Sequence, residues 1–405
     1  MKATKKVLLT AAVLFIASIN LFSQTEYVDK SQNQFINDFT EINKTIKRKY
    51  THLENKHINI DSLFLVYSEK LKAVKTNDEY KNLLLEYFAE LKNGHSSVFL
   101  SPTYSIDCRA KLIENRVFID RIGKSLIDTG IKEKDEILSV DSVPILEWLK
   151  QQEKFVGAST DEDRLNRAVK RIFFGYLEGK RTLLLKTQTD EKVVTLSFVK
   201  NNDNIKGADT NNYIISDAIN DSIGYITINS MMGNVADEFK QAFEKLRTKP
   251  ILIIDIRNNG GGNSNISEQI TQYLIKQKQK ACVSRWPLFP EKNHYEGKLI
   301  VLIGVNTFSA AESFALDLKE SGNAVFFGSG TGGDTGNHPQ TFTTKYHTSF
   351  RFPTRKPAQI SPKGYPMEGI GVKPDFTVYQ TVEDYLNDVD TVLEFTIHKV
   401  SGVGQ

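Results

Sequence analysis

Apolar residues in the N-terminal quarter of the chain recur at helical spacing. Two such stripes are Phe35-Phe39-Ile42-Ile46-Tyr50 and Tyr80-Leu83-Leu84-Tyr87-Phe88-Leu91. Spacing of three and four residues is typical of amphipathic helices that bury one face. The pattern predicts a helical region over residues 24–100. Its last helix should end at Asn93-Gly94, because glycine adopts the left-handed conformation without penalty.

The pattern changes between residues 101 and 205, where short apolar runs are separated by polar turns. The expected elements are strands at Leu112–Ile119, Thr182–Lys186 and Val193–Val199, and a helical insertion over Ser159–Glu178. This arrangement predicts a small β-rich domain.

Strands and helices alternate over residues 206–405. The expected strands are Ile223–Ile228, Ile251–Ile256 and the run around Val301, and the expected helices are Val235–Leu246, Ser267–Lys276 and one that follows Ser309. Such alternation favours an α/β core with largely parallel strands.

The first 23 residues have the pattern of a secretory signal peptide. Three lysines precede the apolar run Val7–Ile19, which is too short for a stable membrane span. Cleavage is expected near Ser23–Gln24, so the mature protein is expected in the periplasm or outside the cell. Cleavage would remove three lysines and no acids from a net charge of +3, and a chain without net charge lacks the footprint of a nucleic-acid binder.

Cys108 and Cys282 are the two cysteines of the chain. In an exported protein they could form a disulfide, but two buried thiols are an equally good interpretation, because sequence cannot establish their contact. Their spacing does not form a metal-binding pattern.

Ser309 lies where an apolar strand gives way to a helix, a position that allows two interpretations. Backbone N–H groups are unpaired at a helix start, which suits a nucleophile and the stabilisation of an oxyanion. However, Ser309-Ala-Ala-Glu312 also matches the S-x-x-E capping box, in which the serine simply caps its helix.

The loop Asp255-Ile-Arg257-Asn-Asn-Gly260-Gly261-Gly262 follows a buried strand and is the most specific local signal. Three glycines allow the backbone to approach a ligand and to donate N–H groups to it. A P-loop is not indicated, since no Lys-Ser/Thr follows. A tight turn alone is the plain structural alternative.

Two segments resemble known families. Thr129–Ile145 is similar to the glycine-rich segment of PDZ domains, although Lys134 and Ser142 stand where glycine is usual. The ordered series Asp255–Gly262, Asn306–Glu312, Gly328–Gly333 and Glu368–Asp375 resembles the motifs of the C-terminal processing peptidases and their tricorn-type serine peptidase relatives.

This resemblance implies a crotonase/ClpP-like α/β serine peptidase core over residues 206–405 and a PDZ-like domain over 101–205 that can bind a peptide, including its C-terminus. Ser309 would be the nucleophile. The oxyanion hole would use the N–H of Ala310 and one N–H of Gly260 or Gly261. No metal or cofactor is implied, and the partner is a polypeptide substrate.

The identity of the base divides the family. The processing branch uses a lysine after a glycine, but Thr331-Gly-Gly-Asp334 contains none and the next lysine is Lys345. The tricorn type uses a histidine and a glutamate, and His95 and Glu368 stand at the matching positions. A neutral imidazole is ready to accept a proton near pH 7, whereas a lysine must first be desolvated. We therefore expect His95 as base and Glu368 as its partner.

Three further residues are expected to support the site or to bind substrate: Ser96, Arg257 and His338. Ser96 is of interest because the tricorn type has a serine directly before its histidine, where this chain has Gly94. A hydroxyl that bridges His95 and Glu368 would then come from Ser96 or be missing.

The sequence thus predicts an exported, tail-specific type of serine endopeptidase acting on extended polypeptides. Alternatives are a Ser–Lys dyad enzyme that uses Lys345, a non-catalytic peptide-binding relative, and a hydrolase of small esters or amides on the same core.

Overall fold

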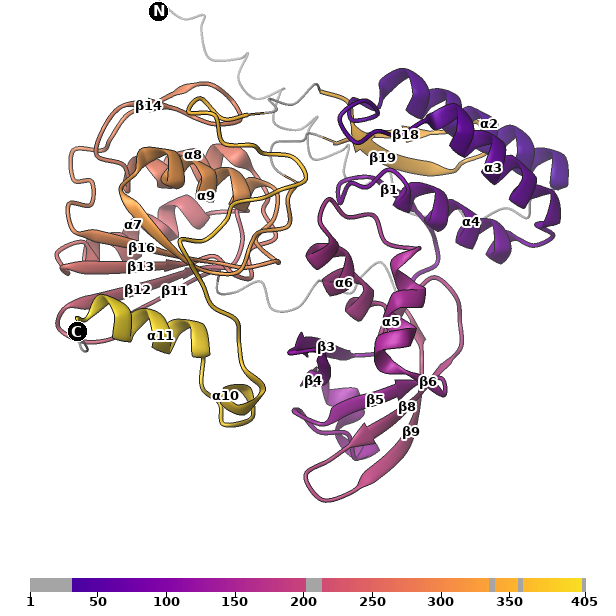
Figure 1. The fold of residues 1–405 in the computed structure, drawn as a ribbon, viewed down its shortest axis with the longest axis horizontal. Coiled ribbons are helices and arrows are strands. Elements are labelled where there is room, and N and C mark those ends of the chain that lie inside the picture. The colour runs from indigo at the N-terminus through magenta and orange to yellow at the C-terminus, as the bar shows by residue number, and fades with distance from the viewer. Residues whose placement is uncertain (1–30, 202–212, 335–338, 356–359, 403–405) are drawn as a thin grey trace, which may run out of the picture.

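The computed structural model describes residues 31–201, 213–334, 339–355 and 360–402. The proposed signal peptide and His338 lie outside these residues. The described chain is a mixed α/β structure with three main groups of strands, and helices pack beside each group (Figure 1). No helix in the described ranges is long and apolar enough to cross a bilayer.

The predicted N-terminal helical region is confirmed. It consists of α2 (Gln32–Lys49), α3 (Ile60–Ala73) and α4 (Asn77–Ala89). Thr76 and Glu79 form a capping box at the start of α4, so the first free N–H groups of that helix are paired. The apolar faces of the three helices share one hydrophobic cluster, as their periodicity predicts.

The same cluster includes a hairpin from far along the chain. Strands β18 (Pro339–Thr343) and β19 (Ser349–Pro353) form a three-stranded sheet with β1 (Ser97–Phe99) beside the N-terminal helices (Figure 1). Phe350 and Phe352 are buried there, and the Phe350 ring lies 5.8 Å from that of Phe88 in α4. The assignment of all residues 206–405 to one core therefore needs correction for this hairpin.

The β-rich part is built on an antiparallel sheet. Its strands are β3 (Cys108–Ile113), β4 (Arg116–Ile122), β5 (Glu136–Val140), β6 (Val143–Pro144), β8 (Lys180–Lys186) and β9 (Glu191–Ser197). The helices η1 (Lys124–Thr129), α5 (Ile145–Glu153) and α6 (Asp161–Lys170) accompany it. A smaller sheet joins β2 (Tyr104–Ser105), β7 (Phe174–Gly175) and β10 (Val199–Lys200).

One expectation for this part was wrong in detail. The single strand expected at 112–119 is a hairpin, because Glu114 and Asn115 both have positive φ (49° and 62°) and turn the chain between β3 and β4. The helical insertion expected within Ser159–Glu178 is present as α6, after which the chain returns as β7.

The third group is a six-stranded sheet in the order β11-β12-β13-β16-β17-β20. Its strands are β11 (Ile214–Ala218), β12 (Ile223–Ile228), β13 (Ile251–Asp255), β16 (Lys298–Ile303), β17 (Ala324–Gly328) and β20 (Phe376–Thr377). All neighbours after the antiparallel β11–β12 pair are parallel, as predicted.

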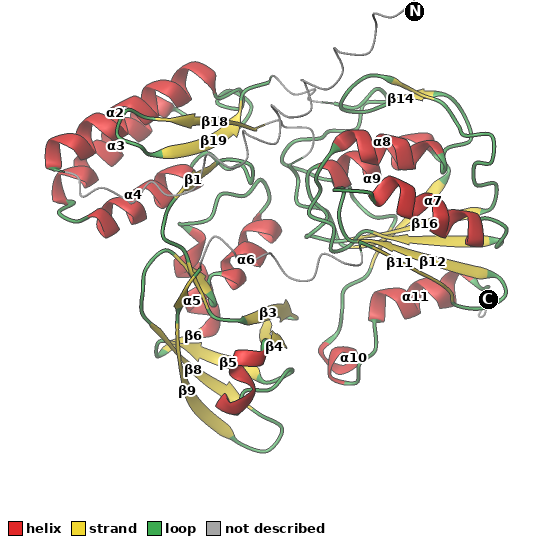
Figure 2. Cartoon of the chain, turned by 180° about the vertical axis from the view of Figure 1, so that it is seen from behind, coloured by secondary structure: helices red, strands yellow, loops and turns green. Residues whose placement is uncertain are grey.

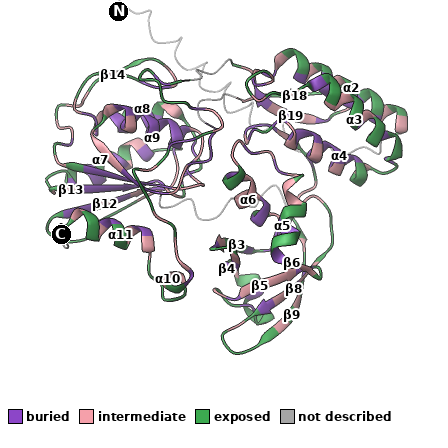
Figure 3. Ribbon diagram, in the orientation of Figure 1, coloured by how far each residue is buried: buried purple, intermediate pink, exposed green. Residues whose placement is uncertain are grey.

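Helices cover both faces of this sheet. They are α7 (Val235–Leu246), α8 (Ser264–Gln272) and α9 (Ala310–Ser321) on one face and α11 (Thr391–Val400) on the other (Figure 2). Along β13, Leu252 and Ile254 pack toward α7–α9 whereas Ile253 packs toward α11, which explains why this strand is apolar throughout. Burial is greatest in the central strands and in α9 (Figure 3).

Two peripheral elements complete the described chain: the β14 (Gln279–Lys280) and β15 (Pro287–Leu288) pair, and α10 (Val382–Leu386). Val382 of α10 packs on Phe118 of β4, which connects the C-terminal segment to the antiparallel sheet. Cys108 and Cys282 are both buried free thiols in different hydrophobic clusters, so the disulfide alternative is not realised.

Candidate active site

Ser309 lies in a strained turn between β16 and α9. Its backbone has φ 57° and ψ −119°, a conformation that an L-residue rarely adopts and that costs about 1–3 kcal/mol. Such strain persists only where the surroundings enforce it. Here the Phe308 N–H donates to the Asn259 carbonyl, and the Ser309 N–H donates to Glu312 at 3.1 Å. The turn presents the serine hydroxyl at the first turn of a helix.

His95 contacts the Ser309 hydroxyl. His95 comes shortly after α4 in the chain, and the Nε2 of its ring lies 2.9 Å from the Ser309 Oγ. The ring stacks on Phe308 with centroids 4.6 Å apart, and the Arg167 guanidinium lies 4.8 Å from the centroid of the same phenylalanine ring. These contacts fix the plane of the imidazole beside the serine.

Asp334 is the carboxylate next to the other ring nitrogen. Its Oδ1 lies 3.5 Å from the His95 Nδ1, which has no hydrogen-bond partner within the described chain. Such contacts are often long in substrate-free sites and shorten in the substrate complex. Burial acts to raise the pKa of Asp334, but the close contact with His95 and the charges of His95, Lys56 and Arg167 outweigh that effect and lower the pKa.

The expectation that Glu368 would orient the histidine is therefore corrected. Glu368 forms a buried ion pair of 2.6 Å with Lys56 and accepts a hydrogen bond of 2.9 Å from Ser159. The Asn93 amide bridges the two carboxylates, since its Nδ2 donates to Asp334 at 2.5 Å and to Glu368 at 3.0 Å. Glu368 is thus connected to Asp334 through the Asn93 amide.

Gly94 and Ser96 explain the departure from the tricorn-type pattern. The Gly94 N–H donates to the Asp334 Oδ2 at 2.8 Å, and a Cβ on Gly94 would lie 2.6 Å from that oxygen. A serine before His95 would therefore have to displace the Asp334 carboxylate or the Arg167 guanidinium. The Ser96 hydroxyl donates to the Asn93 Oδ1 at 3.0 Å, which orients the amide rather than bridging His95 and Glu368.

The helix stop before this segment also differs from the expected one. Lys92 has the positive φ of 50°, and Gly94 is not among the glycines with positive φ. Glycine is required at position 94 by the close approach of Asp334, not by its own backbone conformation.

The glycine-rich loop packs directly against the nucleophile turn. Gly261 has φ 91°, and a Cβ there would lie 2.6 Å from the Phe308 carbonyl oxygen and 2.9 Å from the Ala310 nitrogen. The Gly261 N–H donates to the Asn259 side chain at 2.9 Å. Within the described residues, the N–H groups of Gly260 and Ala310 donate to no protein acceptor, so they are the pair available to a ligand.

Arg257 holds the first part of this loop in place through ion pairs. Its guanidinium lies between two carboxylates, with contacts of 2.6 Å to Asp255 and 2.6 Å to Asp390 at the start of α11. Burial acts to lower the pKa of Arg257, but the hydrogen bonds and charges of Asp390 and Asp255 raise it. This saturated ion-pair network makes Arg257 a supporting residue and not a substrate ligand.

Lys345 lies apart from this arrangement. It occupies the turn between β18 and β19, where its N–H donates to Glu41 of α2 at 3.4 Å and its ammonium lies over the Tyr346 ring. The side chain is exposed. This position gives no support to a Ser–Lys dyad.

Glu312 connects the nucleophile turn to the segment that carries Asp334. One carboxylate oxygen accepts from the Thr331 hydroxyl at 2.6 Å and the Gly333 N–H at 2.7 Å. The other accepts from the N–H groups of Ser309 and Asp334 at 3.1 Å and 3.0 Å. Burial raises the pKa of Glu312 to about 8, although the hydrogen bonds from Thr331, Gly333 and Asp334 act to lower it. Only the carboxylate form can accept from all four donors.

Replacing Glu312 with glutamine is expected to disturb both ends of the site. The amide NH₂ would face two donors, and each unsatisfied buried group costs about 1–3 kcal/mol. We expect the free energy of unfolding to fall by about 2–5 kcal/mol and kcat to fall by about 100-fold, as displaced catalytic groups do. Denaturant unfolding and peptide hydrolysis measure these effects. Glu394→Gln, exposed in α11, is the control, and wild-type behaviour of Glu312→Gln would refute this role.

Sequence reasoning missed Asp334, Glu312 and Asn93 as parts of one network. The available signal was Thr331-Gly-Gly-Asp334, where an aspartate stands in place of the expected lysine. A carboxylate in a glycine-rich turn after a buried strand can approach a charged partner closely, and here that partner is His95.

Comparisons with known proteins match three consecutive parts of the chain. Residues 222–378 match Peptidase family S41, and residues 112–198 match the N-terminal domain of the Bacteroidetes S41 peptidase family. Residues 31–89 match the Tricorn protease C1 domain.

Individual relatives agree with these matches. The Tricorn protease of Thermoplasma acidophilum is 27% identical over 189 residues, which are 44% of this chain and 16% of the relative. The carboxyl-terminal-processing protease of Picosynechococcus sp. is 24% identical over 271 residues, which are 64% of this chain and 60% of the relative. The chain therefore spans less than two thirds of the length of these curated relatives.

A solved structure is similar over almost its whole length. The crystal structure of mature CPAF has a TM-score of 0.77 at 14% identity, with 92% of this chain and 99% of that chain covered. At this identity the likeness shows the fold. The family matches support a serine-type peptidase, and the likeness to CPAF shows the shared fold. Within that class, the matched regions are similar to the C-terminal processing and tricorn-type peptidases.

Proposed function

We propose that the mature protein is an exported serine endopeptidase in which Ser309 is the nucleophile, His95 the base and Asp334 the group that orients the base. The observation that carries this proposal is the 2.9 Å contact between the His95 Nε2 and the Ser309 Oγ at the start of α9. The lowered pKa of Asp334 supports it, because an ionised carboxylate holds the proton on Nδ1 and stabilises the imidazolium.

The mechanism is acyl transfer. His95 takes the Ser309 proton as Oγ bonds to the scissile carbonyl carbon, and the N–H groups of Ala310 and Gly260 donate hydrogen bonds to the oxyanion. The C–N bond then breaks, and His95 returns its proton to the leaving amine. Water then attacks the acyl-enzyme. His95 takes a proton from this water and returns a proton to the Ser309 Oγ as the ester bond breaks, which releases Ser309.

The architecture suggests how a polypeptide reaches this site. We assign the six-stranded sheet with α7–α9 as a crotonase-like core and the antiparallel sheet with α5 and α6 as a PDZ-like module. A PDZ-like module binds an extended peptide at a sheet edge and can hold its C-terminus. We therefore propose extended or partly unfolded polypeptides as substrates, with the signal pattern of residues 1–23 as the basis for export.

An active-site label tests this proposal directly. A fluorophosphonate should modify the wild-type protein at one residue, and the same sample should cleave an unfolded polypeptide faster than its folded form. The Ser309→Ala variant should show neither activity, while Ser401→Ala, a change in the exposed C-terminal segment, should retain both. A folded wild-type sample that does not label near neutral pH would favour the non-catalytic peptide-binding alternative. Turnover of small esters without cleavage of unfolded protein would favour the small-ester hydrolase.

A further inference from the structure

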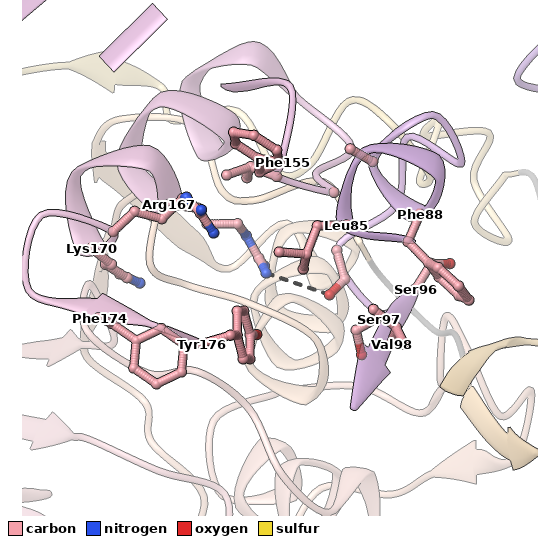
Figure 4. Close-up of a pocket in the computed structure, with 15 residues that line it drawn as sticks. Leu85, Phe88, Ser96, Ser97, Val98, Phe155, Arg167, Lys170, Phe174 and Tyr176 are labelled. Carbon is pink, nitrogen blue, oxygen red and sulfur yellow. Dashed lines mark hydrogen bonds between the residues drawn. The ribbon is translucent and has the colours of Figure 1, made fainter. Parts of the chain in front are cut away.

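A cavity of about 270 Å³ lies between α4, β1 and α6 (Figure 4). Gly94 and Ser96, the two neighbours of His95 in the chain, form part of its wall. Its volume lies below the roughly 300–1,000 Å³ of pockets for drug-sized ligands, so it suits one amino-acid side chain. We call it the α6 pocket, because Arg167, Lys170 and Arg171 at the C-terminal end of α6 line it.

Much of the wall of the α6 pocket is apolar. The side chains concerned are Leu85, Phe88, Val98, Phe155, Phe174 and Tyr176. Several of them are aromatic, and they come from α4, β1 and the chain around α6 and β7. Such a wall favours the methylene stem of a ligand residue over a bare ion.

The cations Arg167, Lys170 and Arg171 lie among these apolar side chains, and the Arg171 guanidinium lies 4.9 Å from the centroid of the Phe155 ring. Arg167 pairs with Asp163 at 2.7 Å and reaches across the pocket to the Gly94 carbonyl (Figure 4). Lys170 and Arg171 instead contact neutral oxygens, at 3.3 Å from the Asn306 Oδ1 and 3.1 Å from the Gln152 Oε1. Neither of these two cations forms an ion pair with a carboxylate of the described ranges.

Two further observations support a ligand at this place. Lys170 is exposed and is one of the residues that line the pocket, so its ammonium is accessible to a ligand from solvent. Burial, followed by the charge of Arg167, lowers the pKa of Lys170, and burial lowers that of Arg171. A bound anion would relieve both effects. The Asn306 contact also joins the pocket to the turn that carries Ser309.

We propose that the α6 pocket is a specificity site that receives one carboxylate-bearing residue of the polypeptide substrate close to the scissile bond. The carboxylate would contact Lys170 and Arg171, and its apolar stem would pack on the aromatic wall. The carboxylate can belong to a glutamate or aspartate side chain or to the C-terminus of the substrate. This inference rests on the proposed peptidase function.

The test compares matched peptides on the wild-type protein and on the double variant Lys170→Gln, Arg171→Gln. One peptide series carries glutamate or glutamine at each position around the cleaved bond, and a second ends in a free carboxylate or an amide. We expect the wild type to prefer the carboxylate at one position by about 10- to 100-fold in kcat/KM, the range of charge-assisted hydrogen bonds. The double variant should lose this preference, and Lys186→Gln, exposed at the end of β8, should keep it.

The outcomes separate the two proposals. A preference for internal glutamate that the double variant loses identifies a side-chain carboxylate, and a preference for a free terminus that it loses identifies the chain end. Fluorophosphonate labelling of the double variant controls for its folding and its nucleophile. Normal labelling with no carboxylate preference in the wild type, or with a preference that the double variant retains, would overturn the pocket assignment alone. Absence of labelling in every sample would overturn the peptidase function itself.

Discussion

Replacing His95 with alanine is expected to lower kcat for peptide hydrolysis by about 10⁴- to 10⁶-fold, nearly as much as replacing Ser309. Nucleophile and base act as one unit, so the loss of either removes most of the same catalytic effect. The 2.9 Å contact between the two side chains is the structural reason, since no other base lies within hydrogen-bond distance of the Ser309 Oγ in the described chain.

Two controls make this result specific. His398→Ala, exposed on α11, should leave kcat unchanged. Lys345→Ala should also leave kcat unchanged, because Lys345 lies beside α2. Fluorophosphonate labelling and single-turnover hydrolysis measure the effect. A Lys345→Ala variant that loses labelling while His95→Ala keeps it would assign the protein to the Ser–Lys branch instead.

Replacing Asp334 with asparagine is the second change with a large expected effect, about 10³- to 10⁴-fold in kcat. The Asp334 carboxylate faces donors on both oxygens, from Asn93 on one and Gly94 on the other, with the His95 Nδ1 beside the first. An amide can satisfy only one side, so either its NH₂ opposes the Gly94 N–H or it turns toward His95 and favours the wrong tautomer.

Glu368→Gln provides the matched comparison. It removes the charge that pairs with buried Lys56, and an uncompensated buried charge costs about 3–5 kcal/mol of stability. Because Glu368 reaches His95 only through Asn93 and Asp334, kcat should change by about tenfold or less. Urea unfolding and kcat, measured on both variants, separate the two roles. A larger loss of kcat in Glu368→Gln than in Asp334→Asn would restore Glu368 as the partner of the base.

The pH dependence of stability gives an independent readout for Asp334. Its pKa is lower in the folded protein than in the unfolded chain, so its contribution is present above the unfolded pKa of about 4 and is lost as the pH falls through the folded value. The Asp334→Asn variant should therefore lose less stability on acidification than the wild type. An equal acid-side loss in both proteins would argue against the ionised form.

Local patterns in the sequence determined much of the fold. The apolar stripes of α2 and α4 and the alternation of strands and helices after Ile223 follow from periodicity, which short-range geometry imposes. The helix α7 has the predicted bounds, Val235–Leu246. Local patterns did not predict the hairpin turn at Glu114-Asn115, because two non-glycine residues adopt positive φ there.

The resemblance of four ordered motifs to the processing and tricorn-type peptidases also indicated Ser309 and His95 as a reactive pair, whereas the local pattern alone left Ser309 open as a helix cap. Only the tertiary structure decided which carboxylate lies behind the histidine. Asp334 and Glu368 are 239 and 273 residues beyond His95, and no local pattern ranks two acids at such separations. The buried Lys56 decides the matter physically: it pairs with Glu368 and leaves Asp334, held by Gly94 and Asn93, as the carboxylate that faces the imidazole.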